Sequence, residues 1–197
     1  MEIVIHRVNS LNMLNRLPPT FGAEVDIRAY RSELILNHEP FESGCRFEDF
    51  LDQYHHGLLV LNIKEAGIES AVLSLISKYR IFNFFLLDVE FPYLYRASRE
   101  GNRHIAMRYS EDEPIESALN YSGKVNWVWI DTNTRLPLSR KVCDQLSNFQ
   151  TCMVCPERWG RPEDIIPYRK QMRRLCFELN AVMTSLECVP HWNCSID

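Results

Sequence analysis

The stretch Ala-Glu-Val-Asp-Ile-Arg at residues 23–28 alternates apolar with polar side chains, a period typical of a β-strand. Successive side chains of a strand point to opposite faces, so Glu24 and Asp26 share one face, and Val25 and Ile27 share the other. A solvated sheet edge is not expected to carry such an apolar stripe. The pattern therefore predicts a buried strand with two carboxylates side by side.

Polar side chains also stand at the ends of the apolar runs on either side of this stretch. They are His6 and Arg7 after residues 3–5, His38 at the end of 34–38, and Asn62 and Lys64 at the end of 58–64. Side chains at the ends of neighbouring strands meet at one rim of a sheet or barrel. Two carboxylates, two histidines and a lysine at one rim are what a metal-assisted phosphate site requires. We therefore expect a phosphate site at this rim.

Length and composition restrict the class of protein. The chain has 197 residues, 46% of them hydrophobic, which suits one domain spanning residues 1–197. A net charge of −4 argues against a general binder of nucleic acids or anionic membranes. No signal peptide or apolar run long enough for a spanning helix is visible. The seven cysteines are therefore expected to be reduced thiols of a cytoplasmic protein of unknown oligomeric state.

Strand-like runs alternate with helix-like runs along most of the chain. About eight such units favour the α/β class and a compact (β/α)8 TIM barrel of parallel strands. The competing doubly wound sheet lacks its glycine-rich phosphate loop after the first strand. The first connection, residues 8–21, contains Pro18-Pro19 and predicts a short or missing first helix, and residues 162–179 are expected to form the longest helix.

Four stretches occur in a specific order: Ile-His-Arg-Val-Asn (5–9), Glu-Val-Asp-Ile-Arg (24–28), Asn-His-Glu-Pro-Phe (37–41) and Leu-Asn-Ile-Lys (61–64). This order resembles the glycerophosphodiester phosphodiesterases, which share a barrel superfamily with phosphatidylinositol-specific phospholipases C and spider-toxin-like phospholipases D. The chain is most similar to a small divergent bacterial subgroup. Further shared stretches lie at 85–88, 107–111 and 155–161, so the resemblance covers nearly the whole chain.

The resemblance implies a role for each rim residue. It implies that Glu24, Asp26 and Asn62 hold a divalent ion, Mg²⁺ or Ca²⁺. His6 and His38 are then the acid and base of catalysis, with Lys64 as a third catalytic group. Arg7 binds the phosphate of a small-molecule phosphodiester substrate. Arg108 and Glu157, at the ends of later strands, are expected either to line the substrate pocket or to pair with each other.

The sequence also departs from the family pattern. Val8 stands where the family has glycine, Glu39 replaces an aspartate, and the Glu-Asn-Thr element is absent. The third metal carboxylate falls at Asn62, a neutral oxygen ligand that binds hard cations more weakly. Acidic residues that could compensate are Asp88, Glu90 and Glu157.

Three alternatives to a phosphodiester hydrolase remain open. The first is an inactive barrel that binds a phosphorylated ligand through Arg7, Lys64 and Arg108. The second is a lyase that forms a cyclic phosphate, and the third is a scaffold protein that uses Trp159 and the C-terminal segment for contacts. The histidine pair favours an enzyme, because a pure binder needs no acid and base. The neutral Asn62, which stands in place of the third metal carboxylate, favours the inactive barrel instead.

The cysteines permit a zinc site as a further alternative. Cys152 and Cys155, together with Cys188, His191 and Cys194, would supply enough ligands for tetrahedral zinc. Residues 152–155 look like a strand, however, which turns the first pair to opposite faces. Buried structural cysteines are therefore the preferred interpretation.

Overall fold

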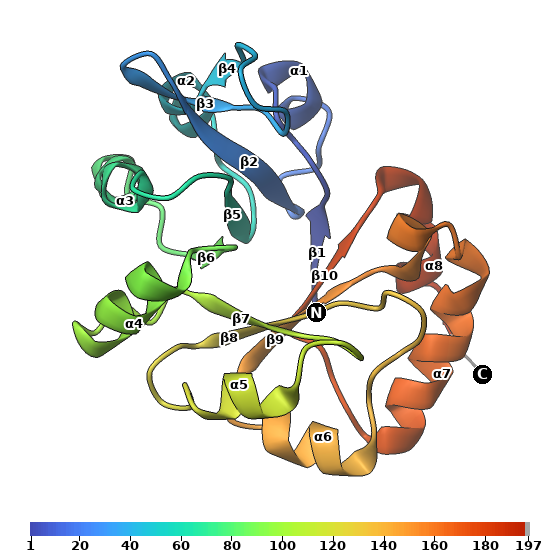
Figure 1. Ribbon diagram of the computed structural model, residues 1–197. Coiled ribbons are helices and arrows are strands. Elements are labelled where there is room, and N and C mark those ends of the chain that lie inside the picture. The colour runs from blue at the N-terminus through green and yellow to red at the C-terminus, as the bar shows by residue number, and fades with distance from the viewer. Residues whose placement is uncertain (196–197) are drawn as a thin grey trace. The chain divides into compact units, whose positions relative to one another are not determined.

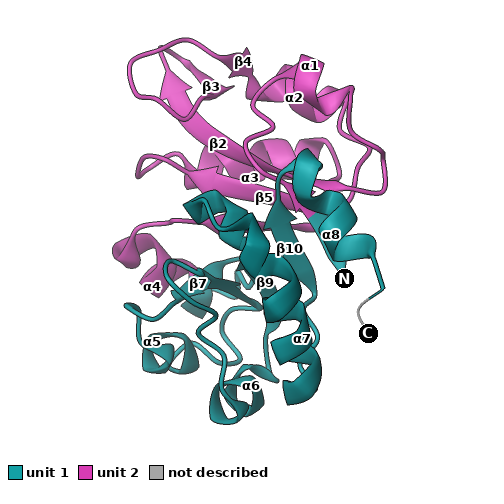
Figure 2. Ribbon diagram, turned by 90° about the vertical axis from the view of Figure 1, so that its right-hand side faces the viewer, with its two compact units in different colours: residues 1–3, 98–197 teal, residues 4–97 magenta. Residues whose placement is uncertain are grey.

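The computed structural model describes residues 1–195 of the chain, and Figure 1 labels their helices and strands. These residues form two compact units, coloured separately in Figure 2. We call Val4–Ala97 the N-terminal unit, and the segment from Ser98 onward together with Met1–Ile3 the C-terminal unit. A single domain over residues 1–197 stays a prediction.

A mostly parallel sheet forms the centre of the N-terminal unit. Strand β2 (Gly22–Tyr30) pairs in parallel with β1 (Glu2–Ile5) and with β5 (Leu59–Ile63), and β5 pairs in parallel with β6 (Phe84–Leu87). Strands β5 and β6 are buried at every position, as expected for runs of apolar residues in a parallel sheet. Strand β1 ends at Ile5, opposite Ala23, so the polar positions of β2 lie just beyond it.

An antiparallel hairpin extends this sheet. Strand β3 (Glu33–Leu36) returns along β2, from Tyr30 opposite Glu33 to Ile27 opposite Leu36, and the short β4 (Cys45–Arg46) pairs with β3. The prediction that residues 34–38 form a parallel strand is therefore wrong. Only two residues separate β2 from β3, whereas a parallel connection needs a crossover of about a dozen or more.

Four helices belong to the N-terminal unit. They are α1 (Leu11–Leu14), α2 (Phe47–Asp52), α3 (Glu69–Lys78) and α4 (Phe91–Arg99), of which α4 runs two residues past the boundary at Ala97. Helix α1 has only four residues and begins at Ser10, whose hydroxyl accepts a hydrogen bond from the Met13 amide. The prediction of a short first helix is confirmed.

Four parallel strands form the sheet of the C-terminal unit. They are β7 (Ala106–Tyr109), β8 (Trp127–Ile130), β9 (Gln150–Val154) and β10 (Ala181–Thr184), paired in this order. The α-helices of this unit are α5 (Ile115–Leu119), α6 (Arg140–Leu146), α7 (Ile165–Leu175) and α8 (Val189–Asn193). Three 3₁₀ turns lie among them, at Pro156–Trp159, Pro162–Asp164 and Leu186–Cys188.

Helix α7 is shorter than the predicted helix over 162–179. Residues 162–164 form a 3₁₀ turn instead of α-helix, and Cys176 adopts the left-handed conformation (φ +53°) that ends the helix. With 11 residues α7 is still the longest helix among residues 1–195. No helix in this described part of the chain is long and apolar enough to cross a membrane.

The cysteines are all free thiols. Cys152, Cys155 and Cys188 are buried, whereas Cys194 is exposed. Burial raises the pKa of the Cys155 thiol to about 12, and the Trp192 indole N–H contacts its Sγ at 3.3 Å. These positions agree with buried structural cysteines. The cytoplasmic location stays a prediction.

Candidate active site

Two carboxylates lie buried side by side on β2. Glu24 and Asp26 are each only 1% exposed. In the ladder with β5, Glu24 pairs with Val60 and Asp26 with Asn62, so the amide of Asn62 comes level with the carboxylates. The alternation within one strand thus places two acidic groups on one face of the sheet, next to the carboxyl ends of β1 and β5.

Both oxygens of the Glu24 carboxylate accept a hydrogen bond. The Asn62 side-chain amide donates to Oε1 at 2.9 Å, and the Arg7 backbone amide donates to Oε2 at 2.8 Å. Arg7, two residues after the end of β1, has a left-handed backbone (φ +55°) at this turn. Burial, and secondarily the charge of Asp26, raises the pKa of Glu24 to about 7.

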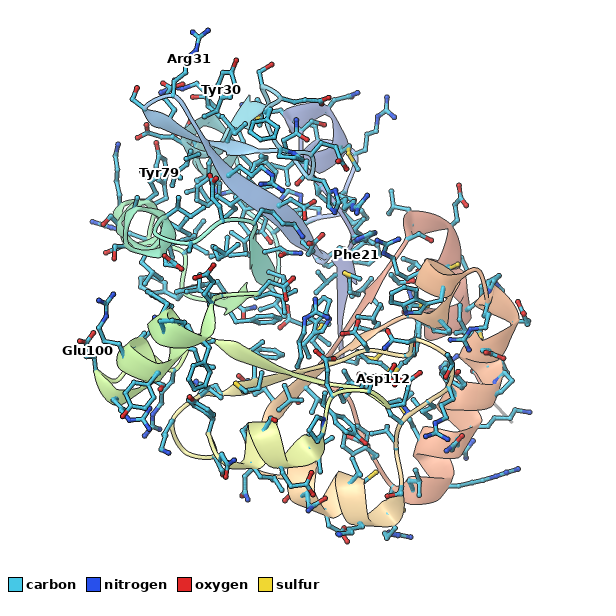
Figure 3. All side chains as sticks on the ribbon, in the orientation of Figure 1. Phe21, Tyr30, Arg31, Tyr79, Glu100 and Asp112 are labelled. Atoms are coloured by element: carbon cyan, nitrogen blue, oxygen red, sulfur yellow. The ribbon has the colours of Figure 1, made fainter. Side chains whose placement is uncertain are left out.

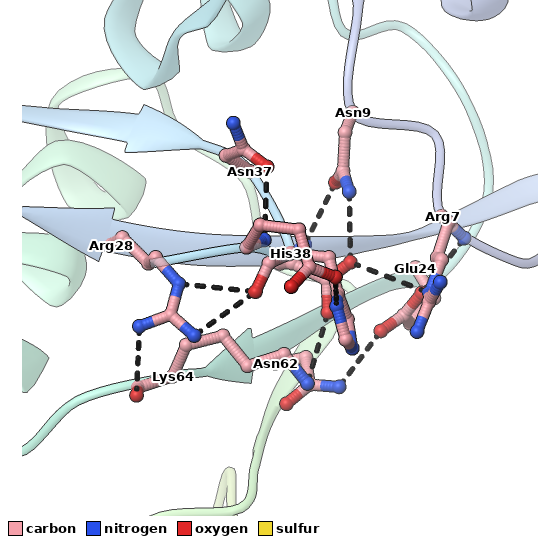
Figure 4. Close-up of polar contacts among 10 residues, drawn as sticks. Arg7, Asn9, Glu24, Arg28, Asn37, His38, Asn62 and Lys64 are labelled. Atoms are coloured by element: carbon pink, nitrogen blue, oxygen red, sulfur yellow. Dashed lines mark hydrogen bonds and ion pairs between the residues drawn. The ribbon is translucent and has the colours of Figure 1, made fainter. Parts of the chain in front are cut away.

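Asp26 is surrounded by three polar side chains from two segments, the loop after β1 and the end of β5. The Lys64 ammonium lies 3.0 Å from Oδ1, and the Asn9 amide donates to Oδ2 at 2.8 Å. The Arg7 Nε lies 3.9 Å from the same Oδ2. Asn9 also accepts a hydrogen bond from the Asp26 backbone amide at 2.9 Å. Lys64 and Arg7 thus bring two positive charges to one buried carboxylate (Figure 4).

The donor set of this cluster fits a hard divalent cation. Asp26 Oδ1 and Asn62 Oδ1 are buried oxygens without a hydrogen-bond partner, since Lys64 meets Oδ1 as an ion pair and not with hydrogen-bond geometry. Together with Glu24 they offer the oxygen ligands that Mg²⁺ and Ca²⁺ prefer. No cluster of three or more His, Cys, Asp and Glu residues suited to a metal ion occurs within residues 1–195. The Asn62 oxygen would therefore have to complete a set based on Glu24 and Asp26.

The hairpin brings Asn37, the residue before His38, opposite Asp26. The backbone amide of Asn37 donates to the Asp26 carbonyl at 3.0 Å, directly after β3. The His38 Nδ1 lies 2.6 Å from the carboxylate of Glu39, which must accept the proton of this bond. That hydrogen bond, with the histidine's charge, lowers the pKa of Glu39. In neutral His38, Nε2 is then the nitrogen that can accept a proton.

Arg28 fixes the main chain of this loop. Its Nε and Nη2 donate to the His38 carbonyl at 3.2 and 3.0 Å, and its Nη1 donates to the Lys64 carbonyl at 3.4 Å. One guanidinium therefore links the two loops that carry His38 and Lys64 (Figure 4). Arg28 is a positioning residue that the sequence analysis did not assign.

The predicted site residues thus fall into two groups. The N-terminal unit holds Arg7, Glu24, Asp26, Asn62 and Lys64 in one connected cluster, with His38 tied to it through the main chain. His6 is half-buried and lies directly before Arg7, at the end of β1.

Arg108 and Glu157 belong to the C-terminal unit. Arg108 forms an ion pair with Asp131, which also accepts a hydrogen bond from the Trp129 indole at 3.3 Å. Glu157 accepts from the Thr184 hydroxyl and the Ser185 amide, both at 2.7 Å. The ion pair of Arg108 and the hydrogen bonds of Glu157 are thus made with different residues and not with each other. Their role in substrate binding stays a prediction.

Comparison with known proteins identifies the fold. No protein-family model and no curated protein matches the sequence. Among solved structures, a glycerophosphodiester phosphodiesterase from Agrobacterium tumefaciens str. C58 is similar with a TM-score of 0.67 at 10% identity, over 95% of this chain and 98% of that chain. A candidate glycerophosphoryl diester phosphodiesterase from the same strain has a TM-score of 0.66 at 8% identity, over 96% of each chain. The chain therefore has the (β/α)8-barrel fold of these proteins, as the sequence predicts.

Proposed function

We propose that this chain, which has the fold of glycerophosphodiester phosphodiesterases, cleaves a P–O bond of a glycerophosphodiester-like small molecule with a divalent metal ion and two histidines. The observation that carries the proposal is the buried carboxylate pair Glu24 and Asp26, with Lys64 and Arg7 beside it. Two acids with 1% exposure are costly to bury unless cations balance them. The two cations beside them, Lys64 and Arg7, are also groups that bind phosphate.

Glu24, Asp26 and Asn62 are the residues that would hold the ion, Mg²⁺ or Ca²⁺. When bound, such an ion polarises a phosphoryl oxygen and neutralises the charge that grows on it. Lys64 contributes a fixed positive charge from the end of β5, and Arg7 contributes a second one from the end of β1. Both charges stabilise the oxygens of a pentacoordinate transition state.

The two histidines carry the proton transfers. His38 holds a proton on Nδ1 against Glu39, so Nε2 can take a proton from the attacking water or give one to the leaving oxygen. His6, next to Arg7 at the end of β1, is the second acid–base group.

One observation favours a second candidate, a barrel that binds phosphate esters without cleaving them. Lys64 and Asn9 already occupy the two oxygens of Asp26, so the cluster has a positive partner without any metal ion. Hydrolysis of an unactivated glycerophosphodiester, followed by phosphorus NMR with Mg²⁺ or Ca²⁺, separates the two candidates. Binding of the ester without cleavage under both metals would leave the inactive barrel as the function.

Metal binding is expected to depend on Glu24 and to improve when Asn62 becomes acidic. Glu24→Gln should abolish binding of Mg²⁺ or Ca²⁺, because it removes one of the two anionic ligands. Asn62→Asp should tighten binding on the order of tenfold, since ligand charge sets the affinity for hard cations. Calorimetric titration of the metal-stripped protein measures both effects.

The matched control is Glu48→Gln. Glu48 pairs with Lys78 on the protein surface and should leave the metal affinity unchanged. If Asn62→Asp binds metal no better than the parent protein, the Asn62 oxygen does not face the ion and the assigned ligand set is wrong.

A further inference from the structure

Asn9 binds Asp26 through both ends of its side-chain amide. The nitrogen donates to Asp26 Oδ2 at 2.8 Å, and the oxygen accepts from the Asp26 backbone amide at 2.9 Å. The loop that carries Asn9 is itself fixed, because Val8 is fully buried and its amide donates to the Glu24 carbonyl at 2.8 Å. Asn9 is therefore a short side chain held by two hydrogen bonds to one residue (Figure 4).

The two oxygens of Asp26 have different surroundings as a result. Oδ2 accepts the Asn9 hydrogen bond and has the Arg7 Nε at 3.9 Å. Oδ1 is buried, and no residue in 1–195 donates a hydrogen bond to it, since the Lys64 ammonium meets it only as an ion pair at 3.0 Å. Lys64 carries its charge on a flexible stem and can make room for an ion, whereas moving Asn9 away from Oδ2 also breaks its bond to the Asp26 backbone. Asp26 therefore offers Oδ1 alone as a ligand.

The other two candidate ligands are engaged in a similar way. The Asn62 nitrogen donates to Glu24 Oε1 at 2.9 Å, which leaves the Asn62 oxygen buried and without a hydrogen-bond partner among residues 1–195. Glu24 Oε2 accepts from the Arg7 backbone amide at 2.8 Å. The ladder of β2 and β5 places Asn62 opposite Asp26. The cluster thus offers single oxygens, and neither carboxylate has both of its oxygens unengaged.

Single oxygens distinguish between the two hard cations. Ca²⁺ takes about six to eight oxygens and often binds both oxygens of a carboxylate, whereas Mg²⁺ takes about six at shorter distances and keeps several waters. A few single oxygens satisfy Mg²⁺ when water and phosphate fill its remaining positions. The same oxygens leave Ca²⁺ short of ligands.

We propose that Asn9 sets the ion preference of the candidate active site: by holding Oδ2 it limits Asp26 to one ligand oxygen, so that the site binds Mg²⁺ in preference to Ca²⁺. This inference rests on the proposed function, because it takes Glu24, Asp26 and Asn62 as the metal ligands. Asn9 acts through Asp26 and is a positioning residue. A purely structural role, in which Asn9 only fastens the loop after β1 to β2, would change the stability of the protein and affect both ions equally.

The test is the ratio of two dissociation constants, Kd for Ca²⁺ over Kd for Mg²⁺, from calorimetric titration of the metal-stripped protein with each chloride salt. The ratio should exceed one in the parent protein. It should fall by about tenfold in Asn9→Ala, because a freed Oδ2 lets Asp26 bind Ca²⁺ through both oxygens. Each ion should also raise the melting temperature in accordance with its affinity, a second readout that needs no substrate.

Asn9→Asp is a second variant that preserves the contact with the strand. Its carboxylate can still accept from the Asp26 backbone amide but has no N–H to donate to Oδ2. Affinity for Ca²⁺ should therefore rise more than affinity for Mg²⁺, and the ratio should again fall.

The matched control is Asn180→Ala. Asn180 lies in the C-terminal unit, and its side-chain oxygen accepts from the Thr151 backbone amide at 2.8 Å. The control thus removes a hydrogen bond from an asparagine to a strand amide outside the carboxylate cluster, and it should leave the ratio unchanged.

The outcomes separate the inference from the proposed function. If the parent protein binds both ions and neither Asn9 variant changes the ratio, the role of Asn9 is refuted and the metal site stands. A parent protein that prefers Ca²⁺ would overturn the inference and leave the proposed function with calcium as its ion. Binding of neither ion would refute both the inference and the metal site of the proposed function.

Discussion

Replacing His38 with alanine is expected to lower kcat for an unactivated glycerophosphodiester by about 10²–10⁴, the usual contribution of a general acid or base. His6→Ala should have an effect of the same size, because each histidine carries one of the two proton transfers. The fold should remain intact, since the His38 side chain is 37% exposed and contributes little to the core. Steady-state hydrolysis across pH should give a bell-shaped profile in the parent protein and lose one limb in each variant.

An activated ester identifies which histidine is the acid. Bis-p-nitrophenyl phosphate has a leaving group that needs no proton, so the variant of the acid histidine should recover most of its rate on this ester. Glu39→Gln keeps an oxygen that can accept from His38 Nδ1 but removes the negative charge, and it should cost less than His38→Ala. Full activity of His38→Ala on the unactivated ester would exclude His38 from catalysis.

Lys64→Met is expected to lower both stability and activity. The Lys64 ammonium is the cation nearest to Asp26 Oδ1, and the side chains are only 17% and 1% exposed. Removing one partner of a buried pair leaves an uncompensated charge and typically costs about 3–5 kcal/mol of unfolding free energy. Denaturant unfolding measures this loss. The same substitution removes a positive charge from the phosphate, so kcat should fall severely even at temperatures where the variant is folded.

A double variant separates the two effects. Lys64→Met with Asp26→Asn removes both charges, so it should regain most of the stability and none of the activity. Lys78→Met is the surface control, because the Lys78 side chain is 61% exposed in its pair with Glu48 and should change stability little. Equal stability of Lys64→Met and the parent protein would show that the ion pair with Asp26 contributes nothing.

The alternation at residues 23–28 was sufficient to predict a buried strand with Glu24 and Asp26 on one face, because strand periodicity fixes which side chains share a face. It did not reveal the partner or the direction of the next strand. Residues 34–38 have the same apolar character whether they run parallel or antiparallel to β2. The informative signal was the short connection of two residues after Tyr30, which no crossover can fit.

The residues that position the site were predictable to different degrees. Arg28 follows Asp26 by two residues and so lies on the same face of β2, which the alternation already implied. Asn9 reaches Asp26 only because Arg7 turns the chain in a left-handed conformation after β1. No periodic pattern predicts that turn in a residue other than glycine. The partners of Arg108 and Glu157 are distant from them in the sequence, and a single sequence does not reveal such contacts.

The hairpin of β2 and β3 gives the protein a place that can accept added sequence. Its tip is exposed at Arg31 and Ser32, and Figure 3 labels Tyr30 and Arg31 at its outer end. Four residue pairs separate this tip from Asp26, so a segment inserted there would extend outward without changing the register that holds His38. The tip is thus an attachment point at which an engineered loop can be added while the strand pairing that supports the carboxylate cluster is kept.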